Sequence, residues 1–233
     1  MKESITILAI SMFAFVLPLP VDSDQEKLNT GAWMMKEGAI THTLVIADDY
    51  FSITAFDLTG KKFLYTYGGT AKPSGKNIEG TIEYHSADKS MVGKKYSYPV
   101  EGNTGSLTIT RNGQIEKWQQ TDDGKSALAG NWRIIRRDDN AMNRGARKTI
   151  KLLSGKRFQW AAINTETGDF FGTGGGNYTF ENGKYTEHIE FFSRDSSRVG
   201  MSLSFDGKVD GKQWFHSGLS SKGDKINEVW ARE

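Results

Sequence analysis

The feature that most constrains this chain is an internal repeat with a spacing of 107 residues. When the sequence is shifted by that number, residues 51–98 align with residues 158–205 without a gap. Identical pairs are spread over the whole stretch: Phe51 and Phe158, Thr66 and Thr173, Gly69 and Gly176, Ile82 and Ile189, and Val92 and Val199. Two copies are too few for a solenoid. The repeat therefore predicts two small domains in tandem.

Shorter matches on either side of this core set the limits of the two units. Gly31-Ala32-Trp33 is similar to Gly130-Asn131-Trp132, and Glu116-Lys117-Trp118 is similar to Glu228-Val229-Trp230. We expect the first domain at residues 28–121 and the second at residues 128–233. The segment from Thr121 to Ala129 would join them.

Each unit carries the pattern of antiparallel strands. Asn-Gly and Asp-Gly pairs, such as Asn182-Gly183 and Asp206-Gly207, favour tight hairpin turns. Apolar residues between the turns recur with period two, as in Phe158, Trp160 and Ala162. In the second unit, strands are predicted to begin near Trp132, Thr149, Arg157, Asp169, Lys184, Gly200, Lys212 and Ile226. The predicted fold is all-β, with two tandem small antiparallel eight-stranded barrels.

The N-terminus has the pattern of an export signal. An apolar run from Ile5 to Leu17, interrupted by Thr6 and Ser11, follows Lys2. A bilayer span needs about 20 apolar residues, so the run fits the core of a signal peptide at residues 1–23. The alternatives are an N-terminal strand or an uncleaved anchor. We expect export to the periplasm or the extracellular space, and not a lipoprotein, because the chain has no Cys to carry a lipid.

Charge and composition exclude several classes of function. The 30 Lys and Arg residues against 28 Asp and Glu residues give a net charge of +2, so no nucleic-acid partner is expected. The absence of Cys rules out disulfides and thiolate metal sites. No cofactor or metal is predicted. A basic stretch from Arg133 to Arg157 could attract envelope lipids or polysaccharide, although exposed charges around a loop at Asp138 to Gly145 are the simpler interpretation.

The Gly-x-Trp motif at the start of each unit, followed by an eight-stranded meander, resembles the signature of the lipocalins, or calycins. The chain beyond the signal peptide resembles exported tandem lipocalin-like proteins of Gram-negative bacteria. The resemblance implies that Trp33 and Trp132 close one end of their barrels and that an Arg packs over the Trp. Arg232 is the candidate for that Arg in the second unit, whereas the first unit has Gln120 instead.

Comparing the two units isolates a candidate site in the second. On inward faces, Glu187 stands where the first unit has Gly80, and His216 stands where it has Ile109. A carboxylate inside an apolar barrel is costly unless it is paired, hydrated or bound to a ligand. Three roles stay open: a hydrogen bond within the core, a polar anchor for a ligand, or acid–base catalysis. Aromatic residues expected beside the pair are Trp160, Trp214, Tyr185 and Phe191.

The sequence favours a binding protein that holds a small apolar or amphipathic ligand in the second barrel. The alternative is a structural or interaction protein with solid-packed barrels, and an enzyme using the Glu187 and His216 pair is a more remote one. No catalytic residue is assigned. A cavity above about 300 Å³ in the second barrel would favour binding.

Overall fold

The computed structural model describes residues 30–103, 105–142 and 145–233, so the predicted signal peptide lies outside the described residues. The described part of the chain contains no helix that is long and apolar enough to cross a bilayer. The described elements are strands, apart from two short 3-10 helices, η1 (Lys89–Met91) and η2 (Ser196–Arg198). These two helices are themselves one repeat apart. Their caps match, because the carboxylates of Asp88 and Asp195 each accept a hydrogen bond from the backbone NH of the serine two residues later.

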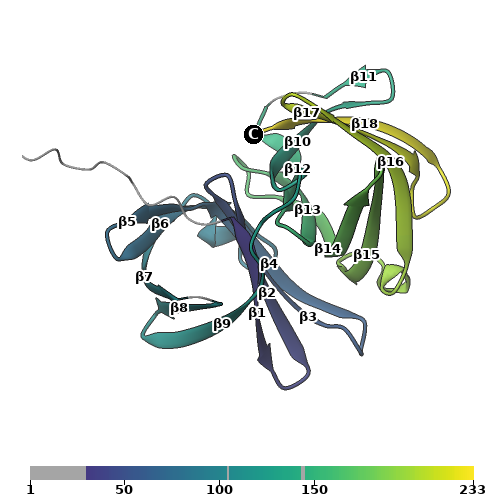
Figure 1. Ribbon diagram of the computed structural model, residues 1–233. Helices are drawn as coiled ribbons and strands as arrows, with labels where there is room; N and C mark the ends of the chain where they lie inside the picture. Colours follow the sequence, from purple (N-terminus) through teal and green to yellow (C-terminus); the bar gives the residue numbers. More distant parts are fainter. Residues whose placement is uncertain (1–29, 104, 143–144) are drawn as a thin grey trace, which may run out of the picture.

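The first sheet closes into a barrel of eight strands (Figure 1). It is antiparallel, and the pairing of β4 with β6 completes the ring. A short extra strand, β5, extends β6 beyond the closure. The strands are β1 (Gly31–Glu37), β2 (Ile40–Ala47), β3 (Tyr50–Asp57), β4 (Lys62–Thr70), β5 (Lys72–Ser74), β6 (Asn77–His85), β7 (Lys95–Asn103), β8 (Ser106–Arg111) and β9 (Gln114–Asp122).

The second sheet forms a second closed barrel of eight strands. Its first strand, β10, pairs with its last strand, β18, and the short β11 adds to β10 outside the ring. The strands are β10 (Gly130–Arg137), β11 (Asn140–Ala141), β12 (Arg147–Leu153), β13 (Arg157–Asn164), β14 (Phe170–Glu181), β15 (Lys184–Phe192), β16 (Ser202–Asp210), β17 (Gln213–Leu219) and β18 (Lys225–Arg232). The eight barrel strands begin within two residues of the predicted positions. The predicted tandem of eight-stranded barrels is confirmed.

The repeat is preserved in the register of the strands. Leu44 lies opposite Ile53 in the first barrel, and the residues 107 positions later, Lys151 and Trp160, lie opposite each other in the second. Because the inward and outward faces alternate along each strand, the same shift assigns inward positions in both barrels. The two interiors can therefore be compared position by position.

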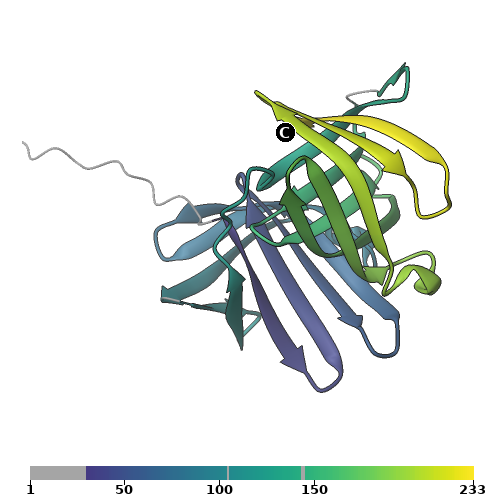
Figure 2. The same ribbon diagram turned by 45° about the vertical axis from the view of Figure 1, so that its right-hand side comes forward.

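The two barrels lie against each other, as Figures 1 and 2 show. Strand β12 contacts β2 and β3, and apolar side chains from both barrels form a shared buried cluster. The buried Gln159 exchanges hydrogen bonds of 2.6–3.1 Å with four hydroxyl side chains. These belong to Ser52, Thr54, Thr66 and Thr173. The buried amide is fully engaged, so this interface combines apolar packing with a specific polar contact.

The segment predicted to join the barrels is anchored rather than free. Strand β9 runs on to Asp122, whose carboxylate accepts hydrogen bonds from Ser154 Oγ at 2.8 Å and from the backbone NH groups of Gly155 and Lys156. The carboxylate thereby fixes a turn of the second barrel to the end of the first.

The basic stretch differs from the interpretation of exposed charges around a loop. Arg133, Lys151 and Arg157 are each at most 8% exposed. Arg157 Nη2 contacts Glu190 Oε2 at 2.5 Å, and β11 occupies part of the predicted loop. Lys151 points into the barrel, whereas ion pairs with Glu233 and Glu190 cover Arg133 and Arg157. The side chain of Lys148 is only 8% exposed as well, so four of the nine charges are withdrawn from the surface.

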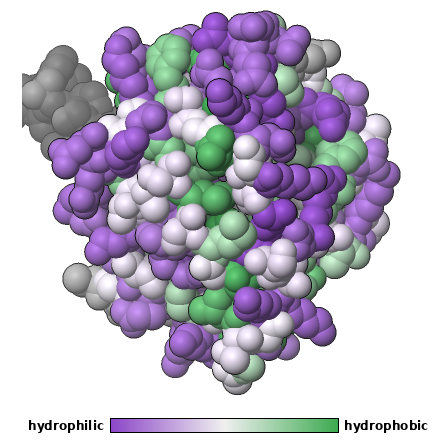
Figure 3. Space-filling view, turned by 90° about the vertical axis from the view of Figure 1, so that its right-hand side faces the viewer, coloured by the Kyte–Doolittle hydropathy of each residue, from purple (hydrophilic) through white to green (hydrophobic). Residues whose placement is uncertain are grey.

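The molecule has a mainly polar face. Figure 3 shows a face dominated by hydrophilic residues, crossed by a narrow band of apolar ones. The large apolar side chains that are most exposed lie in three hairpins: Leu58, Leu64, Ile115 and Leu219. Scattered apolar residues of this kind are normal on a protein surface.

Candidate functional site

A charged pair lies inside the second barrel. Lys151 Nζ on β12 is 2.8 Å from Glu187 Oε1 on β15, and the two side chains are 5% and 7% exposed. Tyr185 donates its hydroxyl hydrogen to the same carboxylate oxygen at 3.0 Å. Glu187 therefore points inward, as predicted, and its charge is balanced by a lysine.

Aromatic rings surround the lysine of this pair. Lys151 Nζ lies between 5.1 and 5.9 Å from the centres of four rings. A cation within about 6 Å of a ring face is attracted by the ring quadrupole. The rings thus offset part of the desolvation of the ammonium group. They are Phe158, Tyr185, Trp214 and Trp230.

His216 is paired with a second buried carboxylate. Its Nδ1 lies 3.2 Å from Glu228 Oε2, which also accepts a hydrogen bond from Trp230 Nε1 at 3.1 Å. Arg137 Nη2 donates to the other oxygen of Glu228 at 2.7 Å. Burial lowers the pKa of His216. The ring is thus neutral at pH 7, and Nδ1 carries its proton because the carboxylate can only accept.

The pKa of Glu228 is about 2, well below its ordinary value. Burial alone would raise this pKa, but the hydrogen bond from His216 and the positive charges of Lys151 and Arg137 stabilise the carboxylate and outweigh the effect of burial. Glu228 is therefore ionised throughout the physiological range.

We expect the free energy of unfolding to fall as the pH drops from about 6.5 toward about 2. A buried neutral His216 with a lowered pKa binds a proton less readily folded than unfolded, and so does Glu228. Protonation of either group therefore destabilises the folded state, and both effects grow as the pH falls. Urea unfolding followed by tryptophan fluorescence across this range would measure it. In Glu228→Gln the slope below pH 4.5 should flatten, and an unchanged slope would contradict the assignment.

Among the described residues, two buried polar atoms in the aromatic interior around Tyr185 have no hydrogen-bond partner. They are Trp214 Nε1 and His216 Nε2, on side chains 0% and 2% exposed. The ring centres lie 5.2 Å apart, and both residues adjoin Gly207 on the neighbouring strand β16. The indole NH is a donor, and the free His216 nitrogen is an acceptor. Buried polar groups are nearly always satisfied, so this donor and acceptor pair requires an explanation.

The other predicted site residues are divided between two places. Tyr185 and Trp214 lie in the interior beside Glu187, and Trp160 is half-buried and packs edge-on against Phe192, with ring centres 5.5 Å apart. Phe191 does not line this interior. It packs against Phe56 of the first barrel, with ring centres 5.0 Å apart.

A β-bulge explains the position of Phe191. The pairing of β14 with β15 shifts between Gly175 and Gly176, so that Gly176 lies opposite Ile189 and Gly175 opposite Phe191. The extra residue reverses the alternation, and the side chain that period two would place inside lies outside. The expectation for Phe191 is therefore corrected.

Sequence reasoning missed Lys151 and Glu228. Lys151 aligns with Leu44 under the same shift of 107 residues that isolated Glu187. The unit comparison could therefore have identified Lys151, but this lysine was interpreted as one of the exposed charges of the basic stretch. Glu228 gave no such signal, because Glu116 occupies its place in the first barrel. There Glu116 bonds to Trp118 Nε1 at 3.3 Å and to Arg111.

The tryptophans of both Gly-x-Trp motifs are buried. Trp132 is fully buried, its Nε1 donates to Leu128 O at 2.8 Å, and Arg232 Cζ lies 4.2 Å from its ring centre. Gly130 has a φ of 148°, and a Cβ there would lie 1.4 Å from Arg232 Nη1. Glycine is needed so that the guanidinium can reach the ring. In the first barrel Trp33 is 6% exposed and lies opposite Gln120.

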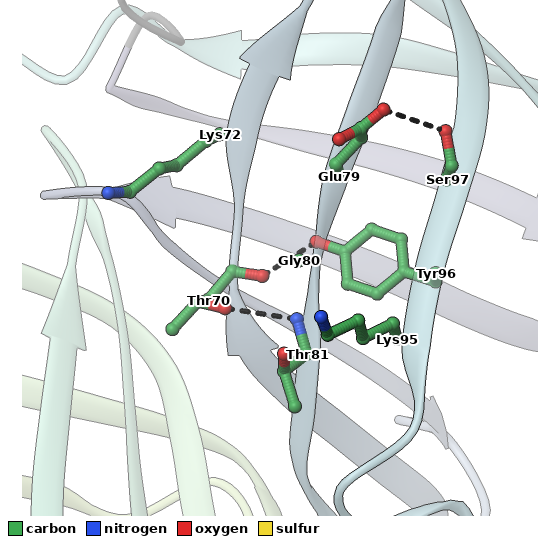
Figure 4. Close-up of a pocket in the computed structure, with 8 residues that line it drawn as sticks. All are labelled: Thr70, Lys72, Glu79, Gly80, Thr81, Lys95, Tyr96 and Ser97. Atoms are coloured by element: carbon green, nitrogen blue, oxygen red, sulfur yellow. Dashed lines mark hydrogen bonds between the residues drawn. The ribbon is translucent and has the colours of Figure 1, made fainter.

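Two described cavities bear on the question of ligand space. At one end of the second barrel, a cavity of about 30 Å³ borders Ile134 and Met142, and none of the predicted site residues lines it. That volume suits about one water molecule. On the wall of the first barrel, a wide groove of about 520 Å³ lies between β5, β6 and β7 (Figure 4).

The polar groups of this groove bond to one another. Tyr96 donates to Thr70 O at 2.8 Å, Thr81 NH donates to Thr70 Oγ1 at 3.0 Å, and Ser97 bonds to Glu79 (Figure 4). A Cβ at Gly80 would lie 1.8 Å from Thr70 O. The close approach of the strands therefore accounts for glycine at the position that Glu187 holds in the second barrel.

Comparisons with known proteins identify no family. No family model matches the sequence, and no curated protein matches it either. Among solved structures, the chain is similar to the Trp-176-Ala mutant of Transferrin Binding Protein B from Haemophilus parasuis Hp5, with 12% identity and a TM-score of 0.25. The match covers 84% of this chain and 61% of that one. We therefore base the function on the geometry of the two barrels.

Proposed function

We propose that this chain is an exported lipocalin-like binding protein with domains at residues 28–121 and 128–233. Its second barrel would hold a small apolar or amphipathic ligand by one polar group. The observation that carries the proposal is the unpartnered pair of Trp214 Nε1 and His216 Nε2 inside an aromatic barrel. Ligand sites commonly combine apolar walls with a few polar anchors of this kind.

The chemistry of the pair defines the polar group. Trp214 offers a hydrogen and His216 offers a lone pair, so a hydroxyl group, which both accepts and donates, satisfies both. Glu187 contributes by fixing Tyr185 and Lys151, and through them the rings around the anchor. Trp160 would border the apolar part of the ligand.

A second candidate is a structural or interaction protein whose barrels are packed solid. The aromatic cluster of the second barrel favours it, because the described cavity at its end has only about 30 Å³. Contact with envelope lipids or polysaccharide, in the periplasm or outside the cell, would then occur on the outer surface.

Conservative variants of two tryptophans test the proposal. Trp214→Phe removes an indole NH that has no partner, so capture of small molecules should weaken, while the melting temperature should fall only by the cost of the smaller ring. Trp230→Phe is the matched control, because its NH is bonded to Glu228. That variant loses a hydrogen bond as well as ring volume, so its melting temperature should fall further, and it should keep capture. Bound species would be identified by native mass spectrometry after incubation with a Gram-negative envelope extract.

The outcomes separate the two candidates. If Trp214→Phe and the unmodified chain capture the same species in the same amounts, the anchor is wrong. If neither captures any species, the solid-packed interpretation is supported.

A further inference from the structure

The contacts between the two barrels follow the internal repeat. Phe63 of the first barrel lies 6.4 Å from Phe191 of the second, measured between ring centres. Their counterparts 107 positions away are Phe170 of the second barrel and Tyr84 of the first, and these rings are also 6.4 Å apart. The same contact is thus made twice, with the barrels interchanged. Subunits of a two-fold symmetric dimer meet in this way.

Four polar residues at this contact are two pairs of counterparts. Ser52 Oγ donates to Gln159 Oε1 at 2.6 Å, and these residues are themselves 107 positions apart. The amide nitrogen of Gln159 donates to Thr66 at 2.8 Å and to Thr173, the counterpart of Thr66, at 3.1 Å. Residues that meet their own counterparts lie near a two-fold axis. The two barrels therefore present equivalent faces to each other.

A bulge in each barrel helps to build this face. The pairing of β4 with β6 shifts between Gly68 and Gly69, at the positions equivalent to the bulge described for the second barrel. Tyr84 and Phe191 follow these shifts, and both side chains point outward to the other barrel. Each residue is only 2% exposed, because the other barrel covers it. The repeated bulge thus produces an aromatic face that is buried when two barrels meet.

The ion pairs across the contact do not follow the repeat. Lys148 Nζ of the second barrel lies 2.9 Å from Glu83 Oε2 of the first, and the side chains are 8% and 23% exposed. The counterpart of Lys148 is Thr41, so two first barrels in the same arrangement would offer Glu83 no lysine. Two second barrels would bring Lys148 to Glu190, which is already paired with Arg157. The charges therefore favour a first barrel against a second one.

A tight turn connects the two barrels. Asp123 and Lys125 are exposed and form an ion pair with each other at 2.6 Å. Gly124 between them has a φ of 74°, and a Cβ there would clash with Thr30 O. A side chain at this position would therefore favour a more open connection. In an open chain, the face of the second barrel is accessible to the first barrel of another chain.

We propose that this face also binds a second copy of the chain, with the first barrel of each copy paired to the second barrel of the other. The exchange gives a closed two-fold dimer and keeps every contact of the face. In dilute solution the barrels of one chain stay together, because the connection holds them at an effective concentration of order millimolar. The dimer forms when chains fold at high concentration or when the turn opens. The proposal concerns the outer face and does not depend on the anchor in the second barrel.

Opening the turn tests the proposal. Gly124→Val and the unmodified chain would be refolded at low and high protein concentration, and gel filtration with light scattering would measure the dimer fraction. The fraction should rise with concentration and be severalfold larger in Gly124→Val. Gly113→Val is the matched control, because Gly113 has a φ of 77° in a hairpin of the first barrel and a Cβ there meets no other atom. A Gly124→Val chain that stays monomeric at every concentration would overturn the proposal.

Charge reversal identifies the exchanged pairing. Glu83→Lys and Lys148→Glu each bring two like charges together when a chain pairs its own barrels. In a mixed dimer one contact carries both reversed charges and the other carries neither, so opposite charges meet in both. After joint refolding of isotope-labelled variants, mixed dimers should outnumber like dimers by about tenfold in native mass spectrometry.

The distribution of the labels decides the outcome. Random pairing of the two variants, or dimers of one variant only, would overturn the proposal. A variant that does not fold alone should be recovered in the mixed dimer, and its absence from the dimers would equally overturn it.

Discussion

Replacing Glu187 with leucine is expected to lower the free energy of unfolding by about 3–5 kcal/mol. The carboxylate is the ion-pair partner of Lys151 at 2.8 Å, and both side chains are almost fully buried. Without it the ammonium group would lie unpaired among aromatic rings, and Tyr185 would lose its acceptor. Urea unfolding at pH 7, followed by tryptophan fluorescence, measures the effect.

A double variant distinguishes the cost of an unpaired charge from a defect in packing. Glu187→Leu combined with Lys151→Met removes both charges and keeps similar volume, so most of the lost stability should return. If the double variant lost as much unfolding free energy as the two single variants together, the pair would not act as a unit.

Replacing Trp132 with alanine is expected to lower the free energy of unfolding by about 3–5 kcal/mol, as for other large buried aromatic side chains. The ring is fully buried, contacts Trp214 with centres 5.9 Å apart, and carries the guanidinium of Arg232 on its face. The variant would leave a cavity and remove the surface on which Arg232 rests. Thermal unfolding by circular dichroism measures the loss.

Trp132→Phe is the graded control. It keeps an aromatic face for Arg232 but loses the hydrogen bond to Leu128 O, so its cost should be clearly smaller. Equal melting temperatures for Trp132→Ala and the unmodified chain would contradict the prediction that Trp132 closes one end of the barrel.

The strands were predictable because local and repeated patterns agreed. Asn182-Gly183 marks a hairpin by its need for positive φ, and the period of two set the faces of β13. Comparison of the units then placed Glu187 and His216 on inward faces without any structure. A duplicated sequence acts as its own reference, so each departure from the shared pattern stands out.

What could not be predicted depends on contacts between distant strands. Phe191 lies outside the interior because the strand pairing shifts at a bulge between Gly175 and Gly176. The period of two in the sequence did not reveal this bulge. The partners of Glu187 and His216 lie on β12 and β18, so the pairing of charges required the closed barrel. The short β11 formed where only a loop was expected, because its two residues extend the edge of β10.

The seam where β10 meets β18 has a consequence for how the chain folds. It pairs Trp132 with Arg232, so the second barrel closes only when residues near its two ends meet. Such long-range closure is slow, of order milliseconds to seconds for β-rich domains. Until it occurs, β10 and β18 each present an unpaired edge that another chain can join. Pairing of β18 with β10 therefore decides between a closed barrel and an open sheet prone to self-association.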